Sequence, residues 1–163
     1  MDHSYIPAIT DDMTHLQLVV QIAMGSALML VSIMVAGLSL WIVEYLLRRS
    51  HAWLTREPHG PKMALVLFSG AMWIMGLITI GVWLWAILFR VLGVFHSLEA
   101  AVYFALVSYT TLGYGDVLLP PEWRLLGGMA AANGFMSFGL LIAMMVEALR
   151  HVRIGQFEQK RRG

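Results

Sequence analysis

The chain contains no cysteine and very little charge. Of its 163 residues, 59% are hydrophobic and 13% are Asp, Glu, Lys or Arg. Without cysteine, neither a disulfide scaffold nor a thiolate metal site can form. The surface of a soluble domain of this length needs far more charge, so the composition excludes a soluble globular protein. We therefore expect an all-α protein embedded in a membrane, because helices satisfy their own backbone hydrogen bonds in hydrocarbon.

Catalytic and cofactor motifs are also absent from the sequence. The six histidines show no metal-ligand spacing, and no nucleophile is paired with a general base in a known pattern. We therefore expect no enzyme activity, no cofactor and no nucleic-acid partner.

Three uncharged stretches are long enough to cross a bilayer. They are residues 22–43, 63–89 and 125–146. A helix needs roughly 20 residues to cross about 30 Å of hydrocarbon. The predicted transmembrane helices are 16–47, 62–92 and 123–149.

A fourth apolar stretch, 100–115, is too short to cross and ends in polar and glycine residues. Non-helical backbone is tolerated at membrane depth only inside protein or beside water, so a helix that enters and returns fits better. Ser97 is the predicted N-cap, and Glu99 in the first turn complements the positive end of the helix. We predict a re-entrant helix at 97–109 followed by a loop at 110–116.

The basic residues are unevenly distributed along the chain. Nine of the 11 Lys and Arg residues lie between positions 48 and 62 or after position 149. The positive-inside rule then predicts an extracellular segment at 1–15, a basic cytoplasmic loop at 48–61 and a basic cytoplasmic tail at 150–163. The loop is expected to attract anionic lipid at the cytoplasmic face.

The loop at 110–116 has the sequence TTLGYGD, in which two glycines enclose a tyrosine before an aspartate. This run resembles the selectivity filter of the potassium channel family, whose usual form is TVGYGD. From about residue 62 to residue 149, the order of outer helix, pore helix, filter and inner helix resembles the pore domain of prokaryotic two-helix potassium channels. The helix at 16–47 is additional to that pattern. The resemblance implies an integral protein of the prokaryotic inner (cell) membrane.

The resemblance also implies a potassium site made largely of backbone oxygens. The ion-binding residues would be Thr111, Leu112, Gly113, Tyr114 and Gly115, whose oxygens replace the hydration shell of the permeant K⁺. Successive carbonyls face one axis only if the backbone adopts conformations that side chains disfavour, and glycine makes these accessible. The residues expected to support the filter are Thr110, Asp116, Tyr103 and Phe104. The charge-derived topology places the Asp116 end of the filter outside, as the family requires.

One chain supplies a single filter strand, whereas a closed filter needs four. The sequence contains one copy of the motif and no internal repeat. We therefore expect a homotetramer with fourfold symmetry.

The inner helix carries two candidate gating hinges, Gly134 and Gly139, within the sequence GFMSFG. Small residues also permit close helix packing, and this alternative for Gly134 stays open. Phe138, Ile142 and Val146 follow at steps of four and are candidate cavity-lining residues. A packed helix shows the same spacing, so the pattern does not separate the two roles.

The sequence departs from the family pattern at several positions. Leu112 replaces the usual valine, and Val107 occupies a position where some relatives carry a carboxylate. The first helix lacks arginines at every third position, so it is not a voltage sensor of the usual kind. The leading hypothesis is a potassium-selective channel. The alternatives are a nonselective cation channel and a non-conducting regulatory subunit, and an additional regulatory partner is left open.

Overall fold

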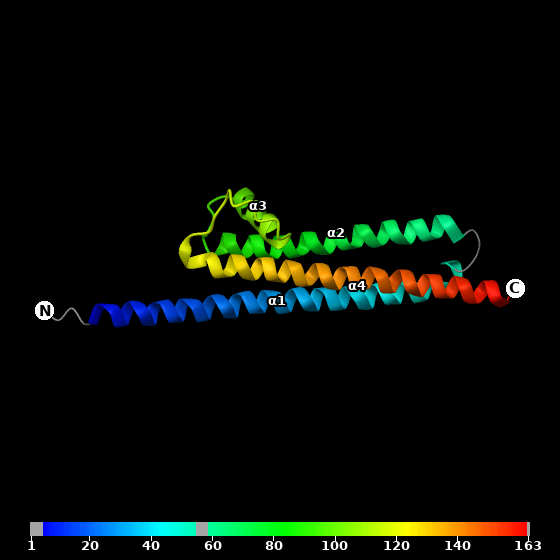
Figure 1. Ribbon diagram of the computed structural model, residues 1–163, viewed down its shortest axis with the longest axis horizontal. Helices are drawn as coiled ribbons and strands as arrows, with labels where there is room; N and C mark the ends of the chain where they lie inside the picture. The colour runs from blue at the N-terminus through cyan, green and yellow to red at the C-terminus, as the bar shows by residue number, and fades with distance from the viewer. Residues whose placement is uncertain (1–4, 55–58, 163) are drawn as a thin grey trace. The chain divides into compact units, whose positions relative to one another are not determined.

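The computed structural model describes residues 5–54 and 59–162, and all the regular structure in these ranges is helical. The elements, shown in Figure 1, are α1 (Tyr5–Leu54), α2 (His59–Val91), α3 (Leu98–Tyr109), the 3₁₀ turn η1 (Pro121–Trp123) and α4 (Arg124–Arg162). Three segments are long and apolar enough to cross a membrane, namely His15–Ser50, Pro61–Val91 and Pro121–Glu147. The structure therefore has the all-α architecture that the composition predicted, with three long apolar helices and one short one.

The long helices extend beyond the ranges predicted from charge. α1 continues to Leu54, and α2 begins at His59, so much of the predicted loop at 48–61 is helical, while 55–58 lies outside the described residues. α4 likewise continues through the predicted tail to Arg162. Charged residues limit the part of a helix that lies in hydrocarbon, but they do not end it, because Arg, Glu and Lys are good helix formers.

The predicted extracellular segment is also helical from Tyr5 onward, and residues 1–4 lie outside the described part of the chain. Pro7 is compatible with this helix because it stands in the first turn, where its missing N–H has no intrahelical partner to lose. The side of the membrane on which each polar segment lies stays a prediction.

The chain divides into two compact units that share the long helices. The first unit comprises the described residues up to Val31 together with Val82–Phe135, and it contains all of α3. Its core is built from the end of α2, from α3 and from the start of α4. The side chains of Trp85, Phe89 and Leu126 are completely buried there. The loop that follows α3 is therefore attached to the best-packed part of the chain.

The second unit comprises Ser32–Gly81 and the described residues from Met136 onward. Trp73 of α2 donates a hydrogen bond of 2.5 Å from its indole Nε1 to the hydroxyl oxygen of Ser39 in α1. A Cβ built on Gly70 would lie 2.7 Å from the sulfur of Met145 in α4. A small residue at position 70 thus allows α2 and α4 to approach closely, as in membrane helix packing.

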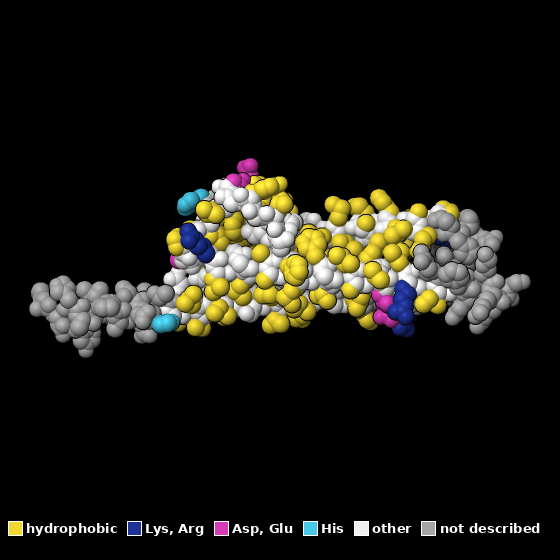
Figure 2. Space-filling view, in the orientation of Figure 1, with side chains coloured by type: hydrophobic (Ala, Val, Ile, Leu, Met, Phe, Trp, Pro, Cys, Tyr) yellow, Lys and Arg dark blue, Asp and Glu magenta, His cyan; other side chains and the backbone are white. Residues whose placement is uncertain are grey.

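Most hydrophobic side chains on the long helices are exposed in the single chain. In an apolar window of 18 residues from each span, the buried share is 11% in α1, 11% in α2 and 22% in α4. On the face drawn in Figure 2, hydrophobic side chains cover the helices, and the few charged side chains lie away from the middle of each span. Exposed apolar area of this extent requires a cover of lipid or of further protein chains.

Candidate functional site

The two ends of the loop before α3 are fixed by helix caps. At the C-terminus of α2, Gly93 has a φ of 70°, its N–H bonds to the carbonyl of Arg90 at 3.2 Å, and the N–H of Val94 bonds to the carbonyl of Phe89 at 3.0 Å. This is a Schellman motif, which needs the left-handed backbone that glycine adopts without strain. At the start of α3, the hydroxyl of Ser97 accepts the N–H of Ala100 at 3.1 Å, so the predicted N-cap is confirmed.

The sign of the backbone angle φ alternates from residue to residue along the filter loop. Thr111 has a φ of 59°, Gly113 of 59° and Gly115 of 76°, whereas Leu112 and Tyr114 between them have no positive φ. Alternation of left- and right-handed residues is the geometry that lets successive carbonyls face one side of a strand. The two glycines adopt it without steric cost. Thr111 is the non-glycine residue with positive φ in the described chain, and left-handed backbone costs roughly 1–2 kcal/mol for such a residue.

The C-terminus of α3 holds the start of this loop. The carbonyl of Val107 accepts the N–H groups of both Leu112 and Gly113, at 3.0 and 3.2 Å. The hydroxyl of Thr110 donates to the carbonyl of Leu106 at 2.7 Å. These bonds satisfy carbonyls that a helix end otherwise leaves without partners. They also fix the backbone on which the alternating segment begins, and the role of Thr110 in supporting a filter stays a prediction.

The far end of the loop is tied back to α3 by a side-chain hydrogen bond. The hydroxyl of Tyr103 donates to the Oδ2 of Asp116 at 2.5 Å. This bond holds the pKa of the Asp116 carboxyl below its ordinary value of 3.8, because it stabilises the ionised form. The N–H of Val117 donates to the Oδ1 of the same carboxylate at 3.1 Å. Two of the residues predicted to support the filter thus lie together, in a partnership that the sequence did not specify.

Phe104 and Tyr114 are two further aromatic residues near the filter loop, and their surroundings differ. Phe104 packs edge-on against Phe89 with ring centroids 5.3 Å apart, and lies 5.4 Å from Phe95. Its ring therefore anchors α3 to α2 and to the preceding loop. Tyr114, one of the predicted ion-binding residues, is 67% exposed in the single chain. Leu112 is exposed as well, so the filter side chains leave apolar surface for further chains to cover.

The two candidate hinge glycines have different surroundings. Gly134 is buried, and a Cβ built on it would lie 1.7 Å from the carbonyl oxygen of Tyr109 at the end of α3. A Cβ built on Gly139 meets nothing within 4 Å. The absence of a side chain at Gly134 is therefore required for the close approach of α4 to the end of α3. This supports the packing alternative at Gly134, and a hinge at either glycine stays a prediction.

The predicted cavity-lining residues follow the filter loop in the sequence and belong to the second unit. Ile142 and Val146 are exposed in the single chain, and Phe138 is half-buried. Exposed apolar residues at this spacing can face either a pore or lipid, so their role also stays a prediction.

One buried polar residue was missed by the sequence analysis. Gln21 of α1 is 2% exposed, and its side-chain Nε2 donates to the backbone carbonyl of Glu122 in η1 at 2.6 Å. Four residues further along α1, a Cβ on Gly25 would lie 2.5 Å from the sulfur of Met129 in α4. An amide at the edge of an apolar stretch was the signal available, because a polar group there needs a partner. The additional helix thus contacts the segment between the filter and the inner helix.

Comparisons with known proteins agree with this geometry. Residues 77–151 match the family model described as ion channel. The chain is similar to the potassium voltage-gated channel protein shk-1 of Caenorhabditis elegans, with 38% identity over 58 residues. That match covers 35% of this chain and 11% of the relative, so the chain corresponds to a small part of that protein. No solved structure matches the chain significantly.

The matched range contains the end of α2, all of α3, the alternating loop and most of α4. It therefore coincides with the elements that position the loop at 110–116. With three long apolar helices, the chain is an integral membrane protein, and its residues 77–151 are similar to the ion channel family.

Proposed function

We propose that this protein is a potassium-selective channel that conducts K⁺ passively through a homotetrameric pore. Four copies of the filter strand surround one axis. The carbonyl oxygens of Thr111, Leu112, Gly113 and Tyr114, with the Thr111 hydroxyl, replace the water around the ion. Gly115 completes the strand at its outer end. No reaction is catalysed, and K⁺ is the permeant ion rather than a resident cofactor.

The observation that best supports this proposal is the alternating sign of φ along the loop. Positive φ values recur at every second residue from Thr111 to Gly115. A simple surface turn needs one or two such residues, whereas a strand of carbonyls facing one side needs them in strict alternation. The exposure of Leu112 and Tyr114 in the single chain supports the tetramer, because neighbouring chains would cover these side chains.

The proposed orientation places the N-terminus and the filter mouth outside the cell and the C-terminus inside, in a prokaryotic inner membrane. It is supported by the concentration of Lys and Arg between positions 48 and 62 and after position 149. The basic segments would attract anionic lipid at the inner face.

The test is K⁺ efflux from liposomes that contain the purified protein. Gly113→Ala places a side chain where φ is 59°, so it should abolish flux by straining the filter. Gly128→Ala is the matched control, because a Cβ there meets nothing within 4 Å and its φ is not positive. A tetramer that loses flux in the first variant and keeps it in the second supports the proposal.

The alternative functions predict different results in the same assay. A nonselective cation channel would release Na⁺ as readily as K⁺. A non-conducting subunit would give no flux as a stable protein and would assemble with another channel chain. Equal flux from Gly113→Ala and from the wild type would contradict conduction through this filter.

A further inference from the structure

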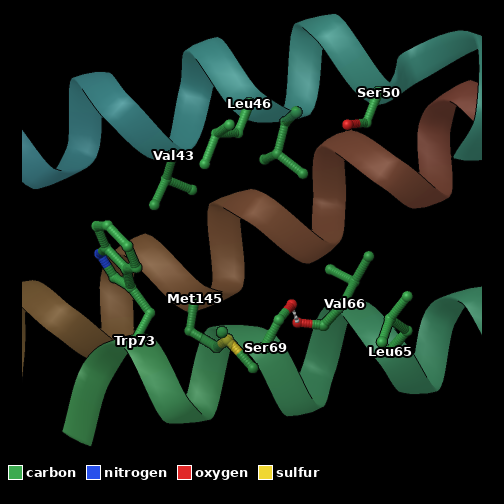
Figure 3. Close-up of a pocket in the computed structure, with 10 residues that line it drawn as sticks. Val43, Leu46, Ser50, Leu65, Val66, Ser69, Trp73 and Met145 are labelled. Carbon is green, nitrogen blue, oxygen red and sulfur yellow. Dashed lines mark hydrogen bonds between the residues drawn. The ribbon is translucent and has the colours of Figure 1, made fainter. Parts of the chain in front are cut away.

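An apolar cavity of about 260 Å³ lies within the second unit. Figure 3 shows Val43 and Leu46 of α1 on one side of it and Val66 and Trp73 of α2 on the other. Met145 of α4 lies between the two helices and contributes its thioether. The lining is hydrophobic apart from two serine hydroxyls, and one of these, on Ser69, donates to its own helix at the carbonyl of Val66.

The cavity extends from one membrane boundary toward the middle of the apolar spans. Its lining residues come from the last two turns of the span in α1 and the first turns of the span in α2, so it begins at a membrane boundary. The lining residues of α2 run from Leu65 to Trp73, which is 73 − 65 = 8 steps or roughly 12 Å at about 1.5 Å per residue. One leaflet is half of a hydrocarbon core of about 30 Å, so the cavity extends through most of a leaflet.

Trp73 lines the end of the cavity that lies nearer the middle of the span in α2. The indole Nε1 of Trp73 donates to the hydroxyl of Ser39 at 2.5 Å, and Ser39 is buried. This bond joins α1 to α2 across the end of the cavity. A flexible chain that entered from the membrane boundary would end against the Trp73 ring.

The other end of the cavity is rich in basic residues. Lys62 precedes the lining residues Leu65 and Val66 by three and four positions, so it lies on the same face of α2. It is 8% exposed, so its side chain lies against the protein. On α1, the lining residue Ser50 follows Arg48 and Arg49 directly, and one acidic residue, Glu44, pairs with Arg48 at 2.5 Å. Between positions 44 and 62 the sequence has four basic residues and two acidic residues, so this stretch carries a net charge of 4 − 2 = +2.

We propose that the cavity is a lipid site that takes one acyl chain of an anionic phospholipid. The chain lies between α1 and α2 with its end at Trp73, and the phosphate lies beside Lys62 and Arg49. A zwitterionic lipid offers the same chain, but its head group carries no net charge to complement the basic end. The additional helix α1 forms one wall, so the site does not exist in a pore domain of two helices.

The test uses phospholipids with a photoreactive diazirine near the end of one acyl chain, carried in vesicles with the wild-type protein. A phosphatidylglycerol probe and a phosphatidylcholine probe of the same chain length are compared, and labelled peptides are mapped by mass spectrometry. The anionic probe should label the peptides that contain Trp73 and Met145. Unlabelled phosphatidylglycerol should compete with it, and unlabelled phosphatidylcholine should compete about fivefold less well per basic residue engaged.

Two pairs of variants separate a site from general lipid contact. Val66→Phe fills the cavity and should reduce labelling several-fold, whereas Leu67→Phe, one residue away and outside the lining, should leave it unchanged. Lys62→Gln should remove most of the preference for the anionic probe, and Arg90→Gln at the other end of α2 should not. Equal labelling and competition by the two lipids, or equal effects within each pair, would overturn the proposal. So would wild-type labelling spread evenly over the exposed faces of α2.

A separate observation concerns the first unit, where α1 contacts the segment that follows the filter loop. Gln21 is buried and donates to the carbonyl of Glu122, and its own Oε1 is buried with no hydrogen-bond partner among the described residues. Burying the Oε1 acceptor without a partner costs free energy. The hydrogen bond that Nε2 donates helps to offset this cost. The segment 117–123 connects the filter directly to α4.

We infer from this contact that Gln21 is a positioning residue that holds the outer end of the filter through the segment 117–123. This inference rests on the proposed conduction for one of its two tests. Gln21→Leu should accelerate the decay of K⁺ flux several-fold while initial flux is kept. Gln17→Leu, four residues earlier on an exposed position, is the matched control and should behave as the wild type.

The other test does not depend on conduction. Amide hydrogen exchange should rise several-fold in the segment 117–123 of Gln21→Leu and stay unchanged in the second unit, including around Trp73. Exchange that rises equally throughout the chain, or that matches Gln17→Leu, would refute a local positioning role. Absence of flux from the wild type would instead count against the proposed function and leave the exchange result to decide on Gln21.

Discussion

Replacement of Gly134 by alanine should separate close packing from helix flexibility in the inner helix. A Cβ at this position would lie 1.7 Å from the carbonyl oxygen of Tyr109, whereas ordinary van der Waals contact begins at 3.4 Å. The backbones of α3 and α4 must therefore separate by about 3.4 − 1.7 = 1.7 Å along this contact. Because the opposing atoms belong to backbone, no side-chain rotation can relieve the overlap.

The expected magnitude follows from two opposing effects. Overpacking of a well-filled contact costs about 1–3 kcal/mol, and an overlap with backbone belongs at the upper end of that range. The change from glycine to alanine in a helix gains about 1 kcal/mol. The net destabilisation of Gly134→Ala should therefore be roughly 2 kcal/mol per chain.

Gly139→Ala is the matched control, since it makes the same change in the same helix where a Cβ meets nothing within 4 Å. It should stabilise the helix by about 1 kcal/mol. The free energy of unfolding in mixed micelles of sodium dodecyl sulfate measures both variants, and K⁺ flux is measured in parallel. Equal stability and equal flux of the two variants would refute the packing role of Gly134. A lower open probability of Gly139→Ala with its stability retained would support a hinge at that residue.

Three further predictions concern the filter and its supports. Tyr103→Phe removes the donor that lowers the pKa of Asp116, so the carboxyl should titrate closer to 3.8. The support that the ionised carboxylate gives is present above its unfolded pKa and is lost as pH falls through its folded pKa. The acid limb of a flux profile from pH 3 to pH 6 should therefore move to higher pH in the variant, and an unmoved limb would contradict the bond's role. Ser97→Ala should lower the free energy of unfolding by about 1 kcal/mol through loss of the N-cap of α3, as measured by denaturation against wild type. An unchanged free energy of unfolding would show that this cap does not stabilise the fold. Thr111→Gly should relieve roughly 1 kcal/mol of left-handed strain yet reduce K⁺ flux, because the hydroxyl is lost. A variant that is both more stable and equally conductive would show that the hydroxyl does not bind the ion.

The features that could be predicted from the sequence are those set by local chemistry. The apolar stretches define three crossing helices because the number of residues needed to cross hydrocarbon is fixed by helix geometry. Ser97 was identifiable as an N-cap because its hydroxyl can satisfy a backbone N–H within the same turn. Gly113 and Gly115 indicated left-handed backbone because glycine adopts it without strain.

The features that could not be predicted depend on contacts between distant segments. Thr111 adopts positive φ against its own preference, because α3 and the two glycines determine the path of the loop. Tyr103 and Asp116 were both predicted to support the filter, but the hydrogen bond between them, thirteen residues apart, was not predicted. The contact of Gln21 with Glu122 spans 101 positions, and no local pattern specifies a pairing at that separation. Helix ends were also missed, because charge marks the edge of hydrocarbon and not the end of a helix.

The central claim is that the loop from Thr111 to Gly115 selects K⁺. Its most direct test is the reversal potential of the tetrameric protein in a planar bilayer, with K⁺ on one side and Na⁺ replacing it stepwise on the other. The account predicts a reversal potential that follows the K⁺ gradient in the wild type and in Gly128→Ala. A reversal potential that does not change when Na⁺ replaces K⁺ would contradict it.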